Sequence, residues 1–453
     1  MPFVRKLFSF LLCAALLVSL SAAAFADSSP SPFELTVLVE GGTDTTVRAY
    51  QQDYEGDLYL SLMDLSLALN GTEAQFRLQY NYNNTDGESF SVLPGQTGAP
   101  FTGVTRLLTV SKPDVKHLGL SRHRFYVGEN ERKYYSYRST DRDLYMSLTD
   151  LQLILNVTAE YVSESVIRLY PSRPFTPDLE QLSAEGYFDV FNGIVLADAD
   201  TGRALYVNAP NRVLPIASLS KLMGYYLLAD AMDEGRLRST DVITISENAA
   251  KLSASADGYI RLTKGTGIPA YELLDAMLLA SSNECSLALA EYVAGGEEAF
   301  VELMKAKAEA LGLRSAEFYS SHGLPVFTRS TVTAKLQNRM SAQDLFLLIR
   351  SLLAEHPEIT EITSKKYSKM EKLDYATANS NPLVFNMEGV TGLKTGNTDK
   401  AGNCLAVSLP VTHGGETHTI VLVILGAENA WVRNQASELL LRYAQNYYAE
   451  NGF

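Results

Sequence analysis

The sequence has little of what metal, disulfide or nucleic-acid chemistry requires. Its 453 residues include only three cysteines and six histidines, and no histidine has HExxH spacing or a cysteine nearby. This excludes the familiar zinc sites, so we expect no metal and no cofactor. Basic residues are also in deficit, with 38 Lys and Arg against 52 Asp and Glu and a formal net charge of -14. Nucleic acid is therefore not an expected partner.

Long hydrophobic runs are absent after the first 26 residues. There, Arg5 and Lys6 precede an apolar run that ends in small residues at Ala24 and Ala26. This order is typical of a secretory signal peptide, residues 1–26, and predicts an exported protein. An uncleaved signal anchor is the alternative, because the run is close to spanning length. We expect no C-terminal membrane anchor.

The cysteines that follow the signal peptide are Cys285 and Cys404. Export would permit a disulfide between them. Both lie in apolar segments far apart in the sequence, so we favour two buried thiols.

An internal repeat occupies the N-terminal third. The stretch DLYLSLMDLSLALNGT from Asp57 returns as DLYMSLTDLQLILNVT from Asp143. Each copy predicts a strand, a helix capped by Ser61 or Ser147, and another strand, so residues 30–170 are expected to form a small α+β domain of two repeats. The pattern resembles units related to the copper amine oxidase N-terminal domain. No cluster of copper ligands accompanies it.

Residues 171–184 contain three prolines among polar neighbours and predict a linker. The sequence pattern is different over residues 185–453. The stretch 193–206 predicts a hairpin, 392–411 and 418–427 predict adjacent strands, and 430–448 predicts a closing helix. Strands at both ends with helices between them predict one α/β domain whose sheet is completed by both ends of the segment.

The stretch LPIASLSKLM places Ser218 three residues before Lys221 in an apolar helical segment. Positions i and i+3 share one helix face. A serine hydroxyl becomes a good nucleophile when a base takes its proton, and a lysine serves as that base only when its pKa is lowered. The apolar neighbours favour the neutral amine. A lone S-x-x-K also occurs by chance, so the pair needs support from other motifs.

Two further motifs supply that support. Ser281 and Asn283 form an S-x-N element in a turn between apolar helical stretches, and a K-T-G triplet begins at Lys394. The three motifs together are the signature of penicillin-binding proteins and class A β-lactamases. No E-x-x-L-N stretch lies between Asn283 and Lys394 to activate a deacylating water. This disfavours a β-lactamase.

From about Phe188 to its end, the chain resembles the D-alanyl-D-alanine carboxypeptidases, the low-molecular-mass penicillin-binding proteins. The resemblance is carried by ITISENAA, ELLDAMLLASSNECSLALAEYVAGG and VTGLKTGNTDKAG, besides the motifs. It implies a β-lactamase/transpeptidase-like fold, with an antiparallel sheet flanked by helices and a helical subdomain. It also implies a serine-type carboxypeptidase on the cell-wall side of the cytoplasmic membrane. Its partners would be peptidoglycan stem peptides and β-lactam antibiotics.

The resemblance assigns the catalytic roles. Ser218 would attack the D-Ala-D-Ala carbonyl, and Lys221 would accept its proton. Ser281 would pass a proton toward the leaving D-alanine. Asn283 would hold the substrate amide and the lysine.

The resemblance also assigns the substrate-binding roles. Lys394 and Thr395 would meet the terminal carboxylate, and Gly396 would let the substrate approach the strand closely. Backbone N–H groups of Ser218 and Asn397 would form the oxyanion hole. Many relatives carry histidine where this chain has Asn397. Because the backbone serves the oxyanion, we expect modest consequences, with substrate preference the property open to change.

Two other functions remain open at this point. A DD-endopeptidase would use the same chemistry on cross-links. A wall-binding penicillin sensor would have lost catalysis, but the intact motifs argue against such decay. Tyrosine-rich segments of the repeat domain are candidate contacts for glycan strands, although such residues more often simply build β-sheets; they contain Tyr80, Tyr82, Tyr134, Tyr135 and Tyr137.

Overall fold

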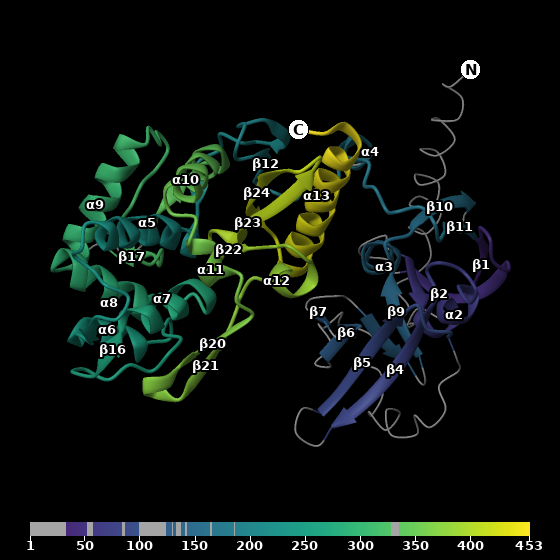
Figure 1. Ribbon diagram of the computed structural model, residues 1–453, viewed down its shortest axis with the longest axis horizontal. Helices are drawn as coiled ribbons and strands as arrows, with labels where there is room; N and C mark the ends of the chain where they lie inside the picture. Colours follow the sequence, from purple (N-terminus) through teal and green to yellow (C-terminus); the bar gives the residue numbers. More distant parts are fainter. Residues whose placement is uncertain are drawn as a thin grey trace, which may run out of the picture.

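The structure is a computed structural model that describes residues 33–51, 58–83, 87–98, 124–128, 130–132, 137–140, 143–163, 165–184, 186–327 and 335–453. The predicted signal peptide lies outside these residues. Figure 1 shows two bodies, which we call the N-terminal unit (33–170) and the C-terminal unit (186–453). Within the described ranges, no helix has the length and apolar character needed to cross a membrane.

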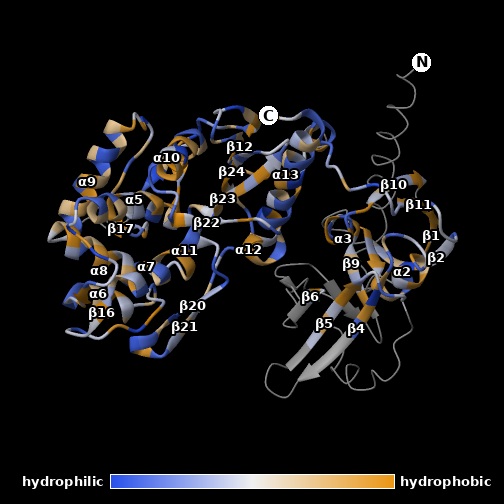
Figure 2. Cartoon of the chain, viewed as in Figure 1, coloured by the Kyte–Doolittle hydropathy of each residue, from blue (hydrophilic) through white to orange (hydrophobic). Residues whose placement is uncertain are grey.

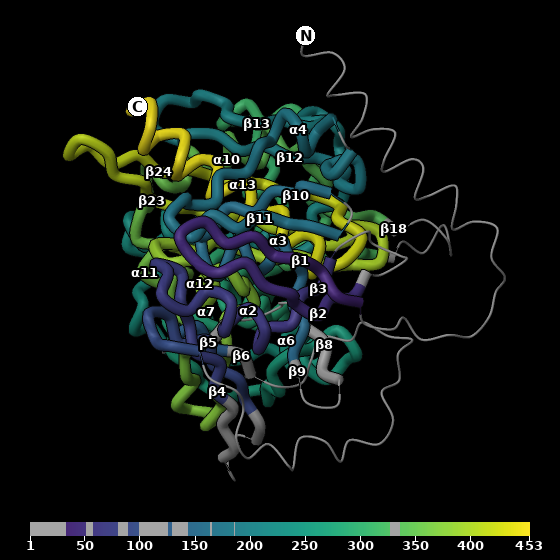
Figure 3. Tube along the Cα trace, turned by 90° about the vertical axis from the view of Figure 1, so that its right-hand side faces the viewer, coloured from purple at the N-terminus to yellow at the C-terminus, as the bar shows by residue number. Residues whose placement is uncertain are grey.

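The N-terminal unit contains a seven-stranded and a four-stranded sheet. The seven-stranded sheet has the order β10 (Thr158–Ser163), β11 (Val166–Tyr170), β1 (Phe33–Val39), β2 (Thr45–Gln51), β3 (Leu58–Ser61), β9 (Asp143–Ser147), β8 (Tyr137–Thr140). The four-stranded sheet has the order β4 (Phe76–Asn83), β5 (Gly87–Pro94), β6 (Arg124–Val127), β7 (Asn130–Arg132). Figure 3 views the molecule from the side of this unit.

The two sequence repeats pair with each other through β3 and β9, which run antiparallel. Leu60 lies opposite its own equivalent, Met146, and Tyr59 lies opposite Ser147, the equivalent of Ser61. A local two-fold axis therefore passes between Leu60 and Met146. Helices α2 (Leu62–Ala68) and α3 (Leu148–Leu155) follow, and both predicted serine caps are formed. Each helix is followed by a hairpin rather than by the single predicted strand.

The C-terminal unit is built on a five-stranded sheet in which all neighbouring strands are antiparallel. Its order is β13 (Ala204–Asn208), β12 (Gly193–Asp198), β24 (Glu416–Ala427), β23 (Gly402–His413), β22 (Gly392–Thr398). The predicted hairpin β12–β13 pairs with β24, so the sheet is completed by both ends of the segment as expected. The stretch 392–411 forms two strands, β22 and β23, because the chain reverses after Thr398.

Helices cover both faces of this sheet. Alternate residues of β12 point to opposite faces, so Val195 joins one core with the helical part and Ile194 joins another under α13 (Ala430–Asn451). Figure 2 shows that α13 carries both hydrophobic and hydrophilic residues. The helical part contains α5 (Ser220–Asp233), α6 (Glu247–Ser253), α7 (Ala270–Leu279), α8 (Asn283–Ala294), α9 (Glu297–Ala310) and α10 (Ala342–Glu355).

The segment 171–184 differs from a free linker. It contains the short helix α4 (Leu179–Ala184), and the Leu179 side chain is buried in the core under α13. Asn446 of α13 donates a hydrogen bond to the Phe175 carbonyl at 3.1 Å. The segment that contains the three prolines is therefore packed along the C-terminal unit.

Candidate active site

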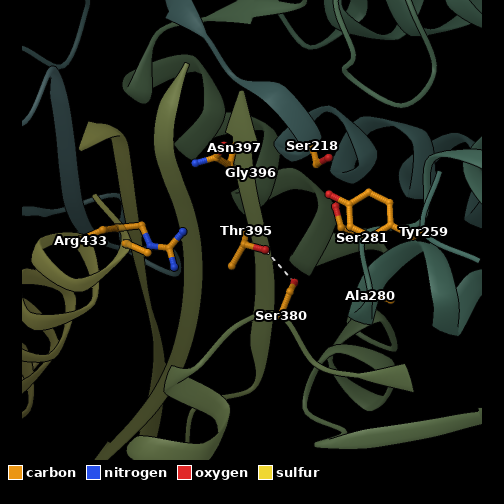
Figure 4. A pocket seen from close by; sticks show the side chains of 10 residues that line it. Ser218, Tyr259, Ala280, Ser281, Ser380, Thr395, Gly396, Asn397 and Arg433 are labelled. Carbon is orange, nitrogen blue, oxygen red and sulfur yellow. Dashed lines mark hydrogen bonds between the residues drawn. The ribbon is translucent and has the colours of Figure 1, made fainter. Parts of the chain in front are cut away.

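A pocket opens beside the edge strand β22, the turn η2 (Ala217–Leu219) and the junction of α7 and α8 (Figure 4). Five of the eight predicted site residues line it. The other three, Lys221, Asn283 and Lys394, are buried. The lining residues are Ser218, Tyr259, Ala280, Ser281, Ser380, Thr395, Gly396, Asn397, Ala430 and Arg433.

The Lys221 amine has three hydrogen-bond partners. Its Nζ lies 2.8 Å from Ser218 Oγ, 2.7 Å from Asn283 Oδ1 and 2.8 Å from the His322 carbonyl oxygen. The Asn283 amide is oriented by its Nδ2, which donates to the Asp257 carbonyl at 2.9 Å. Two of the three partners of the amine, the Asn283 and His322 oxygens, can only accept hydrogen bonds. A neutral amine that donates to both therefore directs its lone pair at the Ser218 hydroxyl.

Electrostatics favour that neutral amine. Lys221 is fully buried, and burial, together with the charge of Lys394, places its pKa well below the ordinary lysine value. Burial, followed by the charge of Lys221, also lowers the pKa of His322 to about 3. The His322 ring is therefore neutral near pH 7. His322 contributes to the site through its backbone carbonyl, which accepts a hydrogen bond from Lys221.

The backbone around the nucleophile adopts conformations that side-chain-bearing residues seldom use. Ala217 has φ +47° and Ser281 has φ +65°. Such backbone strain concentrates at functional sites. Gly323 packs directly behind this turn, where a Cβ would lie 2.0 Å from the Ala217 carbonyl oxygen. The glycine after His322 is thus required for the close approach that brings the His322 carbonyl to Lys221.

Strand β22 presents the K-T-G triplet in an unexpected way. The Lys394 side chain is buried, and its Nζ donates to the Thr395 carbonyl oxygen at 3.0 Å. Burial, followed by the charge of Arg433, lowers the pKa of Lys394 to about 7. Lys394 therefore does not line the pocket, and its charge contributes to the lowered pKa of Lys221. Its contact with the substrate carboxylate stays a prediction. Thr395, by contrast, lines the pocket.

Three polar side chains of the pocket, besides the small residues Ala280 and Ala430, were missed from the sequence. Arg433 lies in the first turns of α13, Ser380 hydrogen-bonds Thr395 at 2.7 Å between their hydroxyls, and Tyr259 is 57% exposed beside Ser281. Arg433 and Tyr259 lie outside any of the three motifs. Ser380 lies in the stretch ATANSNPL, in which the two flanking asparagines are buried and bond backbone carbonyls.

Gly396 leaves open the space in front of the nucleophile. A Cβ there would lie 3.1 Å from the Ser218 backbone nitrogen, the predicted oxyanion donor. We expect Gly396→Ala to slow acylation by fluorescent penicillin roughly 100-fold, because loss of one oxyanion donor has about that effect.

Gly193→Ala is the matched control for this substitution. Gly193 lies in the same sheet, and its Cβ would meet ordinary contacts at 3.5 Å or more. An unchanged acylation rate in Gly396→Ala would show that the Ser218 N–H does not face the reacting carbonyl.

The comparisons with known proteins point to the family that the motifs indicate. The S-x-x-K, S-x-N and K-T-G motifs, brought together at the edge of an antiparallel sheet, are the signature of the penicillin-binding class. The profile of the D-alanyl-D-alanine carboxypeptidase family matches residues 191–429, and the chain belongs to this family.

This chain spans less than two thirds of the length of several of the relatives that it matches. The chain is 32% identical over 257 residues to D-alanyl-D-alanine carboxypeptidase DacF of Bacillus subtilis, and the match spans 56% of this chain and 62% of that protein. It is 30% identical over 292 residues to a D-alanyl-D-alanine endopeptidase of Pseudomonas aeruginosa, and this match spans 63% of this chain and 83% of that protein. The solved structure of the peptidoglycan synthesis regulatory factor PBP3 from Streptococcus pneumoniae is similar, with a TM-score of 0.52 and 29% identity, covering 56% of this chain and 73% of that one.

Proposed function

We propose that this protein is an exported serine-type D-Ala-D-Ala carboxypeptidase that removes the terminal D-alanine from peptidoglycan stem pentapeptides. The observation that carries the proposal is the Lys221 amine, held by two acceptors and directed at Ser218 Oγ. Family membership supports the same reaction.

Acylation would begin at Ser218. Its Oγ attacks the carbonyl carbon of the penultimate D-alanine while Lys221 takes the hydroxyl proton. The oxyanion forms against the Ser218 and Asn397 backbone N–H groups. As the C–N bond breaks, Ser281 would donate its hydroxyl proton to the leaving amine and take up the proton that Lys221 had accepted. Water then hydrolyses the ester on Ser218 and restores the hydroxyl.

The substrate carboxylate would meet Arg433 and Thr395 at the other end of the pocket. Arg433 is 4% exposed, and its NH1 donates to the Cys404 carbonyl at 3.2 Å, so its position is well defined. A buried guanidinium is well suited to bind a carboxylate. Cys404 and Cys285 are both buried free thiols, as we expected from the sequence.

Arg433→Ala is expected to reduce the preference for a free C-terminus. The ratio of kcat/KM for a D-Ala-D-Ala peptide acid to that for its C-terminal amide should fall roughly 10- to 100-fold, the value of one charge-assisted hydrogen bond. Arg433→Lys is the control: it keeps the charge but loses the two-pronged donor. An unchanged ratio in Arg433→Ala would assign carboxylate recognition to another group.

The experiment that tests the activity uses two substrates. The purified mature chain is given a pentapeptide ending in D-Ala-D-Ala and, separately, a cross-linked peptide dimer. Release of free D-alanine from the first supports the carboxypeptidase. Cleavage of the dimer alone would favour an endopeptidase, to which the Pseudomonas relative is the specific pointer. Absence of cleavage and of penicillin labelling would leave the wall-binding sensor.

The repeats enter this proposal only as a candidate glycan contact. The side chains of the tyrosine-rich segments lie outside the described residues. Retention of the N-terminal unit on purified peptidoglycan strands, measured with and without those tyrosines, would test the contact.

A further inference from the structure

Helix α13 has a second face that does not touch its sheet. Its polar residues Gln435, Glu438, Arg442 and Asn446 follow helical spacing, and the first two are 7% and 6% exposed. Glu438 accepts a hydrogen bond from Asn386 of α12 (Leu383–Asn386) at 2.9 Å. The other three residues bond segments that precede the C-terminal unit. This stripe is therefore an interface rather than a solvated helix face.

The N-terminal unit docks on this stripe through its second repeat. Gln435 Nε2 donates to Asp150 Oδ1 at 3.2 Å, and an Arg442 guanidinium nitrogen donates to the Leu153 carbonyl at 3.3 Å. Asp150 is 2% exposed. The oxygen of the Gln435 amide accepts the Tyr187 hydroxyl proton at 2.9 Å. Gln435 thus joins the second repeat to the start of the C-terminal unit.

The two repeats use the same position differently. Asp64 occupies in the first repeat the place that Asp150 occupies in the second, and it forms an ion pair with Arg48 of its own unit at 2.8 Å. Asp150 bonds α13. The acidic residue of the second repeat therefore takes part in docking.

The docked residue lies close to the pocket. Gln435 is two positions after Arg433 and follows the first four residues of α13, whose N–H groups have no partner within the helix. Asn429 caps this end by accepting the Val432 N–H at 2.9 Å. The Asp150 contact is a further restraint on the start of α13, and it comes from the N-terminal unit.

We propose that the N-terminal unit is a positioning element for substrate recognition: through Asp150 and Gln435 it holds the first turns of α13, and hence Arg433, against the pocket. The predicted effect on carboxylate recognition by Arg433 rests on the proposed function, whereas the predicted restraint on α13 does not depend on it. Such coupling through packed elements changes affinities by roughly 2- to 30-fold.

The test uses Gln435→Glu, Asp150→Asn and the double variant. Gln435→Glu sets two carboxylates opposite each other, whereas Asp150→Asn leaves an amide oxygen that can still accept from Gln435. The double variant restores one amide and one carboxylate with donor and acceptor exchanged, and the new carboxylate at position 435 can still accept from Tyr187. We expect faster amide hydrogen exchange over residues 430–436 in Gln435→Glu, exchange close to that of the wild type in Asp150→Asn, and restored protection in the double variant.

The second readout is the acid-to-amide ratio of kcat/KM. We expect it to fall roughly 2- to 30-fold in Gln435→Glu and to recover in the double variant, while kcat changes less. The matched control is Asp64→Asn, which breaks the equivalent residue's ion pair inside the N-terminal unit and should lower stability without moving the ratio or the exchange at 430–436.

Each outcome decides the inference. Unchanged exchange in Gln435→Glu, or exchange that the double variant fails to restore, would overturn it. Altered exchange with an unchanged ratio would overturn the link to Arg433. If the wild-type protein releases no D-alanine, the proposed function fails, and the exchange measurement still decides whether the N-terminal unit restrains α13.

Discussion

Ser218→Ala is expected to abolish covalent labelling by fluorescent penicillin and to slow D-alanine release by at least roughly 10,000-fold. Without the hydroxyl, no ester to the acyl carbon can form, and Lys221 has no proton to accept. The variant keeps the pocket, because its Cβ occupies the same place in the turn η2. Labelling is read after denaturing electrophoresis, and D-alanine is measured with the pentapeptide substrate.

Ser341→Ala is the matched control, since it removes a serine hydroxyl outside the pocket. Ser341 caps α10 by accepting the Asp344 N–H at 3.1 Å. Its loss should cost about 1 kcal/mol of unfolding free energy and leave labelling intact. Labelling that persists in Ser218→Ala would place the nucleophile at another residue.

The reactive pair could be predicted because its chemistry is local in sequence. Lys221 follows Ser218 by three positions, and one helical turn brings them together. The S-x-N and K-T-G elements were recognisable for the same reason. The third partner of Lys221, the His322 carbonyl, carries no side-chain signature, so the sequence did not assign His322 to the lysine. Arg433 was equally hidden, since its place depends on how α13 packs.

The sheet of the C-terminal unit followed from the hairpin 193–206 and the apolar strands near the end. The pairing of the two repeats could not be predicted, because sequence similarity between the copies does not determine which of their strands pair. Leu60 faces Met146 only because the two copies meet about a two-fold axis. The burial of Lys394 could not be predicted from the sequence either. The K-T-G triplet identifies the residues, whereas the desolvation of the amine depends on the packing around β22.

Lys221→Met is the second substitution with a large expected effect. We expect kcat/KM for D-alanine release to fall roughly 100- to 10,000-fold, the contribution of a positioned general base. Lys221→Arg separates the base from the charge: arginine stays protonated, so it should be as inactive as methionine if the amine takes the Ser218 proton. Substantial activity in Lys221→Arg would show that a positive charge, not a base, is what the site needs.

The lowered pKa of Lys221 also predicts the direction in which activity changes with pH. The amine is a base only above its folded pKa, so kcat/KM should fall as pH falls through that value. Lys394→Gln removes a charge that lowers the pKa of Lys221, and the acid limb should move to higher pH. Between its folded pKa and the ordinary value of 10.5, the unfolded chain binds more protons at this lysine. The unfolding free energy of the wild type should therefore rise with pH relative to Lys221→Met. A difference independent of pH would mean that the lysine is protonated in the folded protein, and the base would have to be sought elsewhere.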